Sequence, residues 1–122
     1  MPDNTAQRGQ LEDLNTILRF ARTRLGADIT VQRLLILINV YLNEGLSQGE
    51  LLRQLDSTSA AALSRNLAEL SDWTPRKIDG PNLIQLQVDQ QNLRRKRVFL
   101  TDGGRKFIKQ WLEKVPDQAD AD

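Results

Sequence analysis

Two short helical patterns separated by only four polar residues restrict the fold of this chain more than any other feature. Ser47-Gln48-Gly49-Glu50 matches a capping box, in which the serine hydroxyl bonds the amide three residues on and the glutamate reaches back to the serine amide. A short leucine-rich helix follows, and the polar residues 56–59 end it. Apolar residues with helical spacing then resume over residues 60–70. Two short helices joined in this way indicate a helix-turn-helix.

Two further helices are expected before this motif. Apolar side chains over residues 10–25 recur at steps of three or four, and Gly26 ends the pattern. Thr30 can cap a second helix over residues 31–42. That segment is apolar nearly all round, so we expect it in the middle of the core.

A hairpin and a last helix are expected after the motif, beyond a loop over residues 72–82. Alternation over residues 83–88 and 97–101 predicts two strands, with the mostly polar residues 89–95 as the loop between them. Thr101 can cap a final helix over residues 102–114. The expected fold class is mainly α with a small β-hairpin (α+β), a winged helix-turn-helix.

The length of 122 residues suits one domain. We expect that domain over residues 10–115, a flexible arm over residues 1–9 and a disordered acidic tail over residues 116–122. The longest apolar run, Leu34–Ile38, is far shorter than the roughly 20 residues of a membrane span, and the first ten residues lack signal-peptide character. These features predict a cytoplasmic protein without a membrane partner.

The composition excludes most kinds of active site. The chain contains no Cys and no His, which excludes disulfides, thiol chemistry, Cys/His zinc sites and histidine acid–base catalysis. It also lacks a paired-carboxylate motif, metal-ligand spacing and a Gly-rich phosphate loop. We therefore expect no enzyme activity, no cofactor and no metal.

The distribution of charge is more informative than the net charge of +1. Residues 10–73 contain six basic and eight acidic residues, whereas residues 76–109 contain nine basic and three acidic ones. Four consecutive cations lie at the expected end of the hairpin loop, and no acid lies directly beside them: Arg94, Arg95, Lys96 and Arg97. Such a run can be a solvated edge strand that resists aggregation. Its single sign and its place after a helix-turn-helix favour contact with DNA phosphates or the minor groove.

The second helix of the motif is the candidate for contacts in the major groove. Its start is small and smooth, so that it can approach base edges closely, and its polar side chains include an arginine that can bond guanine and an asparagine that can pair with adenine if it faces outward. The expected contact residues are Ser59, Ala60, Ala61, Ser64, Arg65 and Asn66.

These two segments resemble the MarR family of bacterial winged-helix transcription regulators. The run Asn92 to Thr101 followed by Asp102-Gly103-Gly104-Arg105 resembles the wing signature of the family, and Ser59 to Leu67 resembles its recognition helix. The resemblance implies that Arg94 enters the minor groove and that Ser64 and Arg65 belong to the recognition helix. Asn92 replaces the acidic residue that usually begins the wing signature.

Two further departures from the family lie outside these motifs. The connection over residues 71–82 is longer than usual, and we expect DNA backbone contacts there and at the start of the motif from Ser47, Gln48, Arg76 and Lys77. The last helix is short, which weighs against a small-molecule effector. The resemblance also implies a homodimer through the first and last helices. The alternative is that the apolar residues of these two helices all pack within one protomer. The residues expected at the dimer interface are Leu11, Leu14, Leu18, Ile108, Trp111 and Leu112.

The leading functional prediction is a dimeric, sequence-specific double-stranded DNA-binding protein, a transcriptional repressor in particular. A two-fold dimer would place two recognition helices about 34 Å apart and would favour an inverted repeat. One alternative is a plasmid or phage protein for centromere binding or replication control. Another is a winged helix used for protein contacts, in which the basic wing meets an acidic partner.

Overall fold

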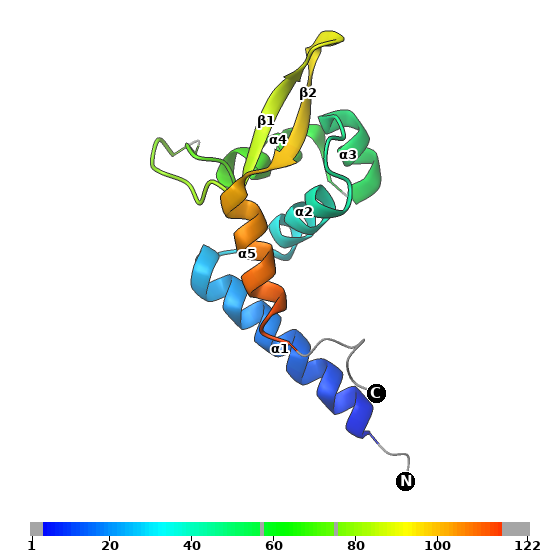
Figure 1. Cartoon of the computed structure of the whole chain (residues 1–122), viewed down its shortest axis with the longest axis vertical. Helices are drawn as coiled ribbons and strands as arrows, with labels where there is room; N and C mark the ends of the chain where they lie inside the picture. The colour runs from blue at the N-terminus through cyan, green and yellow to red at the C-terminus, as the bar shows by residue number, and fades with distance from the viewer. Residues whose placement is uncertain (1–3, 57, 75, 116–122) are drawn as a thin grey trace. The chain divides into compact units, whose positions relative to one another are not determined.

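The computed structural model describes residues 4–56, 58–74 and 76–115, so the expected tail over residues 116–122 lies outside the described residues. The chain divides into two compact units, and each is described by itself (Figure 1). Unit 1 comprises residues 1–29 and 106–122, and unit 2 comprises residues 30–105. Both predicted motifs fall within unit 2. The single domain expected over residues 10–115 stays a prediction.

The first helix, α1 (Thr5–Leu25), begins earlier than its apolar pattern suggested. Residues 5–9, which we expected in the flexible arm, are helical, and that part of the prediction is wrong. Their helical hydrogen bonds begin at once, because the Arg8 backbone N–H donates to the Asn4 carbonyl at 2.9 Å. Arg8 and Glu12, which are four residues apart, form an ion pair at 3.2 Å. Ion pairs at this spacing stabilise a helix, because the two side chains lie one turn apart on the same face. Apolar periodicity finds the buried part of a helix and misses an exposed first turn.

Unit 1 has a small aromatic core formed by α1 and α5 (Asp102–Leu112). The rings of Phe20 and Phe107 lie 5.8 Å apart, and those of Phe107 and Trp111 lie 5.6 Å apart. The Trp111 indole N–H donates to the Ile17 carbonyl at 2.7 Å, which satisfies the one polar atom of that buried ring. The helix α5 begins within unit 2, and its residues from Lys106 onward belong to unit 1.

Three helices of unit 2 begin at side-chain caps; the sequence predicts Thr30 and Ser47 as caps, and Ser59 is a cap that the structure adds. They are α2 (Val31–Leu42), α3 (Gln48–Leu55) and α4 (Ala60–Glu69). The hydroxyls of Thr30, Ser47 and Ser59 each accept the backbone N–H three residues on, at 3.1 to 3.2 Å. Their leucines and isoleucines form the core of the unit, which includes Ile36, Leu37, Val40, Leu51, Leu63 and Leu67.

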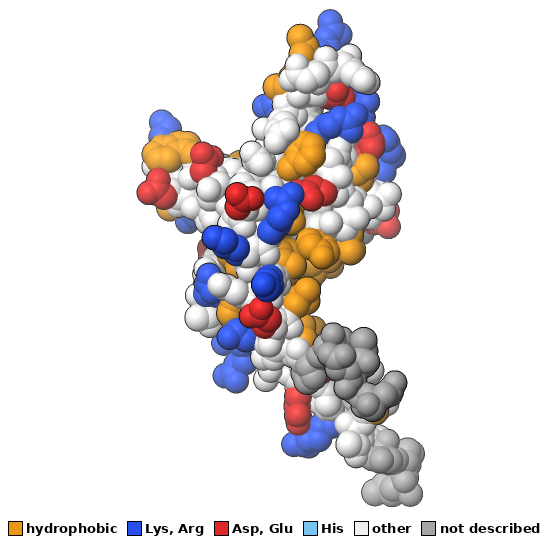
Figure 2. Space-filling view, in the orientation of Figure 1, with side chains coloured by type: hydrophobic (Ala, Val, Ile, Leu, Met, Phe, Trp, Pro, Cys, Tyr) orange, Lys and Arg blue, Asp and Glu red, His pale blue; other side chains and the backbone are white. Residues whose placement is uncertain are grey.

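The expectation that α2 is surrounded by core is wrong. Val31, Leu35 and Leu42 are 47% to 68% exposed, while Val40 on the opposite side of the helix is buried. Figure 2 shows this apolar surface over α2. A helix that is apolar all round need not be buried all round, because burial depends on how many neighbours the unit supplies.

The wing consists of β1 (Ile84–Asp89) and β2 (Asn92–Leu100), paired antiparallel (Figure 1). Only two residues connect the strands, so the loop expected over residues 89–95 is wrong, and the basic run lies within β2. A register shift between Val88 and Asp89 accommodates the extra residues of β2. The segment before α3 pairs with β2, since the Gly45 N–H donates to Val98 at 2.8 Å and the Val98 N–H donates to Leu46 at 2.9 Å.

Residues 71–82 contain neither helix nor strand in their described part, as predicted, but they form a closed loop rather than an open linker. The Gly80 N–H donates to the Asp72 carbonyl at 2.9 Å, and the Asn82 N–H donates to Ser71 at 3.1 Å. A Cβ atom at Gly80 would lie 2.1 Å from the Ser71 carbonyl oxygen, so only glycine fits there.

Candidate nucleic-acid interface

The exposed face of α4 presents the small and polar residues that the sequence selected. Leu63 and Leu67 point into the core, while Ser59, Ala60, Ala61, Ser64 and Arg65 are exposed. The capping bond from the Ala62 N–H to Ser59 Oγ, at 3.1 Å, fixes the first turn of the helix. The first turn of α4 is therefore ordered and free of large side chains, as a helix that approaches base edges requires.

Asn66 does not face outward, and its predicted availability for adenine is wrong. Its Oδ1 accepts the Arg33 Nε–H at 3.0 Å, and its Nδ2 donates to the Ala62 carbonyl at 3.1 Å. The Oδ1 bond therefore joins α4 to α2, and the Nδ2 bond is made within α4, so both ends of the amide are engaged. Helical spacing alone could not show this, because Arg33 is 33 residues away in the sequence.

Two cations of the basic run are free. Arg94 and Lys96 are exposed, and among residues 4–56, 58–74 and 76–115 their side chains make no hydrogen bond or ion pair. Asn92 Oδ1 accepts the Arg94 backbone N–H at 3.1 Å. The asparagine thus braces the backbone before the wing arginine and leaves its guanidinium free for an anionic partner.

The other two cations of the run are paired with acids that do not adjoin the run in the sequence. Arg95 donates to the Glu50 carboxylate at the start of α3. Arg97 donates to Asp89 Oδ2 at 3.0 Å and to the Gly45 carbonyl at 2.8 Å. Figure 2 shows basic and acidic side chains next to each other over this part of the molecule. Strand alternation explains the division, since residues 95 and 97 share one face of β2 and residues 94 and 96 share the other.

Asp89 is anchored as a carboxylate at the end of β1. The Gln91 backbone N–H, which donates to its Oδ1 at 2.9 Å, and the Arg97 guanidinium hold the pKa of Asp89 below its ordinary value of 3.8. Burial opposes this shift but does not outweigh it. The carboxylate stays charged at neutral pH and ties the hairpin turn to β2.

The four residues expected to contact the DNA backbone differ in exposure and in whether their side chains already have partners. Ser47 is buried and its hydroxyl is fully bonded, and Gln48 is half-buried. Arg76 is exposed but pairs with Glu69 of α4 at 3.0 Å. Lys77 is exposed in the left-handed backbone region, with φ of 59°. The sequence therefore overestimated the number of free contact groups in these two segments.

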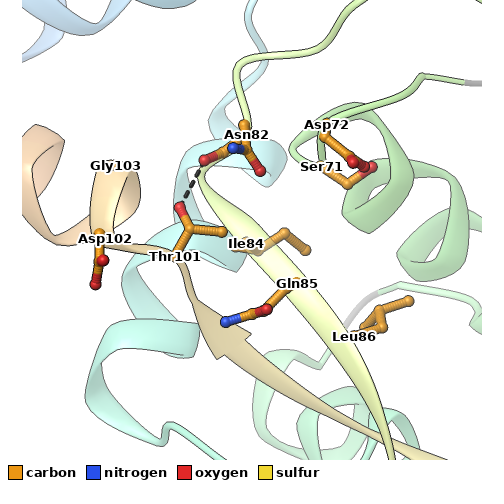
Figure 3. A pocket seen from close by; sticks show the side chains of 9 residues that line it. All are labelled: Ser71, Asp72, Asn82, Ile84, Gln85, Leu86, Thr101, Asp102 and Gly103. Atoms are coloured by element: carbon orange, nitrogen blue, oxygen red, sulfur yellow. Dashed lines mark hydrogen bonds between the residues drawn. The ribbon is translucent and has the colours of Figure 1, made fainter.

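A hollow of about 710 Å³ lies between the end of α4, the start of β1 and the start of α5 (Figure 3). Thr101 lines the hollow, and its hydroxyl donates to the Asn82 carbonyl at 2.6 Å. The lining is mostly polar and includes Asp72, Gln85 and Asp102.

Within the described residues, no cluster of acidic side chains could hold a metal ion, and no helix is long and apolar enough to cross a membrane.

The residues expected at a dimer interface divide into two groups. Leu11, Leu14, Leu18 and Leu112 are 43% to 65% exposed, as an interface requires. Ile108 and Trp111 are buried within the chain and offer no such surface, so their assignment to the interface is wrong. Only the leucines therefore remain available for association.

Unit 2 is thus a winged helix-turn-helix, with α3 and α4 as the two helices and β1 and β2 as the wing. The solved structures to which the chain is similar include the MepR–DNA complex of S. aureus, with a TM-score of 0.67 and 24% identity over 92% of this chain and 82% of that chain. A MepR point mutant bound to an oligodeoxyribonucleotide gives 0.64 and 25% over 85% and 68%. Apo MarR from E. coli gives 0.61 and 19% over 96% and 78%.

These comparisons confirm the predicted fold. The chain has the MarR-like winged helix-turn-helix architecture of known transcription regulators. No protein-family model matches the sequence, and no curated protein matches it significantly.

Proposed function

We propose that this protein is a DNA-binding transcriptional regulator that inserts α4 into the major groove and the wing into the minor groove. The observation that supports this most directly is that the exposed face of α4 and the free cations of the wing belong to one compact unit. A similar fold in MepR occurs in complex with DNA. Arg65 is the main candidate for base contact, and Arg94 and Lys96 are the candidates for phosphate or minor-groove contact.

The regulator acts as a homodimer in this proposal. Leu11, Leu14 and Leu18 recur at steps of three and four on α1 and are exposed, which is the pattern of an unpartnered helix face. A two-fold dimer would present two copies of α4 to one side of a duplex, so an inverted repeat is the expected site. Binding at a promoter would then block transcription, which makes repression the expected outcome.

Selection of binding sites from a random duplex library with the purified protein tests this function. The expected result is an enriched inverted repeat with half-sites about one helical turn apart. Enrichment of direct-repeat arrays would favour partition or replication control instead. Failure to enrich any sequence would refute sequence-specific binding.

A further inference from the structure

Arg95 joins the wing to the first turn of α3 across 45 residues of sequence. Its Nη2 donates both to Glu50 Oε1 and to Ser47 Oγ, the second at 2.9 Å. The Ser47 hydroxyl donates to Glu50 Oε1 at 3.1 Å and accepts the Glu50 backbone N–H at 3.2 Å. We call this network of Arg95, Glu50 and Ser47 the wing clamp.

The network uses the full bonding capacity of the serine hydroxyl, which has one donor and two acceptor sites. Ser47 is 4% exposed, and the side chains of Glu50 and Arg95 are 32% and 41% exposed. Partly shielded, charge-assisted bonds of this kind are stronger than those of a solvated surface pair. Glu50 also lies in the first turn of α3, where a negative charge is favoured by the helix dipole. The capping box therefore does more than begin a helix, because it also receives the wing.

A two-stranded ribbon is marginally stable alone, so its direction depends on what holds its base. The backbone bonds between residues 45–46 and Val98 hold one point of β2, and Arg95 adds a second point nearer the tip. Arg94 and Lys96, on the opposite face of β2, are directed by the same strand. An error in the angle of the wing would therefore move both free cations.

We propose that Arg95 and Glu50 are positioning residues, which set the angle of the wing at which Arg94 and Lys96 reach DNA and make no phosphate contact themselves. The proposal rests on the proposed function. It differs from a charge-only interpretation of the basic run, in which each of the four cations adds its own phosphate contact. Under that interpretation Glu50 merely weakens binding, by neutralising Arg95.

The two interpretations predict opposite effects of Glu50→Ala. If Arg95 is a contact residue, removal of the acid frees it, so DNA affinity rises and the slope of log K against log salt steepens by about one unit. If Arg95 is a positioning residue, affinity falls roughly tenfold and the slope does not steepen, because the misplaced free cations gain no phosphate contact. Arg95→Ala should give the same loss, and the double variant should lose no more than either single variant, because both changes remove one network.

The test measures dissociation constants by fluorescence anisotropy for the purified protein on its selected duplex, from about 50 to 200 mM salt. Arg94→Ala is the matched control, one residue away, and should lower the magnitude of the slope by about one unit. Arg95→Lys separates charge from geometry with little risk to folding, because lysine keeps the charge and lacks the planar fork of arginine. We expect Arg95→Lys to bind several-fold more weakly; wild-type affinity, or tighter binding by Glu50→Ala, would overturn the proposal.

Hydrogen exchange of the free protein tests the clamp without DNA. The Val98 and Gly45 amides, which bond across the base of the wing, should exchange faster in Glu50→Ala and Arg95→Ala than in Arg94→Ala. Unchanged exchange in both variants would refute the clamp even if DNA binding is established. Faster exchange without any DNA binding would retain the clamp and refute the proposed function.

Discussion

At the scale of single residues, the basic run shows that a cation in the sequence is not equivalent to a cation available to a partner. All four residues of the run over 94–97 carry a positive charge, yet within the described residues two are paired and two are free. The acids that make the difference, Glu50 and Asp89, lie 45 and 8 residues away from their partners. Because these acids are not adjacent to the run in the sequence, comparison of neighbouring residues does not reveal the ion pairs. The period-two alternation of β2 was the one local signal that could have divided the run.

Arg65 and Arg94 should contribute to DNA binding in different ways. Arg65→Ala should cost roughly 1–3 kcal/mol of binding free energy and relax the preference at one base pair, because a base contact is lost. Arg94→Ala should weaken binding to all duplexes alike. Titrations against the selected duplex and its single-base variants measure both effects. Equal losses on every duplex for both variants would indicate recognition through backbone and shape alone.

Two adjacent glycines at the start of α5 should respond oppositely to alanine. A Cβ atom at Gly104 would lie 2.0 Å from the Leu83 carbonyl oxygen, so Gly104→Ala should lower the free energy of unfolding by about 1–3 kcal/mol. At Gly103 the nearest backbone oxygen would be 3.4 Å away. Gly103→Ala should raise stability by up to about 1 kcal/mol through helix propensity. Urea denaturation of both variants checks this, and equal effects would contradict the close approach at Gly104.

At the scale of elements, the order of helices and strands could be predicted because it depends on local signals. The predicted caps Thr30, Ser47 and Thr101 each accept a backbone N–H three residues on, at the starts of α2, α3 and α5. The errors occur where tertiary contacts decide: β2 extends back to Asn92 because it pairs with β1, and α2 leaves an apolar side exposed. The exposed first turn of α1 has no apolar pattern to reveal it.

The hairpin turn should lose stability in acid through Asp89. The pKa of Asp89 is lowered in the folded protein, so its contribution is present above its unfolded value of 3.8 and is lost as the pH falls below 3.8 and through the lower folded pKa. Asp89→Asn should abolish this part of the pH dependence. Thermal midpoints of both proteins from about pH 7 to pH 3 should therefore converge toward acid. A constant difference across this range would show that the carboxylate charge does not contribute.

At the scale of the whole molecule, the association of two protomers is the property that is hardest to predict from the sequence. The sequence predicted interface residues on both the first and the last helix, but the two groups differ in burial. Ile108 and Trp111 are buried within the chain. Leu11, Leu14 and Leu18 are exposed. The distinction depends on the aromatic core of unit 1, which no spacing rule reveals. An interface built on α1 therefore stays a proposal that mutation can test.

Leu14→Asp together with Leu18→Asp should convert a dimer into a monomer. Both side chains are more than two-fifths exposed, so the change should cost the monomer little stability while it places charges in the interface. Thr16→Asp, on the opposite side of α1, is the matched control and should remain dimeric. Sedimentation equilibrium measures the mass of each variant. A wild-type protein that is already monomeric, or a double variant that stays dimeric, would exclude this interface.

In the proposed function, one compact unit binds DNA through the first turn of α4 and the free cations of the wing. Fluorescence anisotropy of the purified protein on its selected duplex and on a scrambled duplex, over a series of salt concentrations, tests it most directly. We predict much tighter binding to the selected duplex, with an affinity that falls linearly on a double-logarithmic salt plot. Equal affinity for both duplexes, or an affinity that does not change with salt, would rule out sequence-specific DNA binding by these two elements.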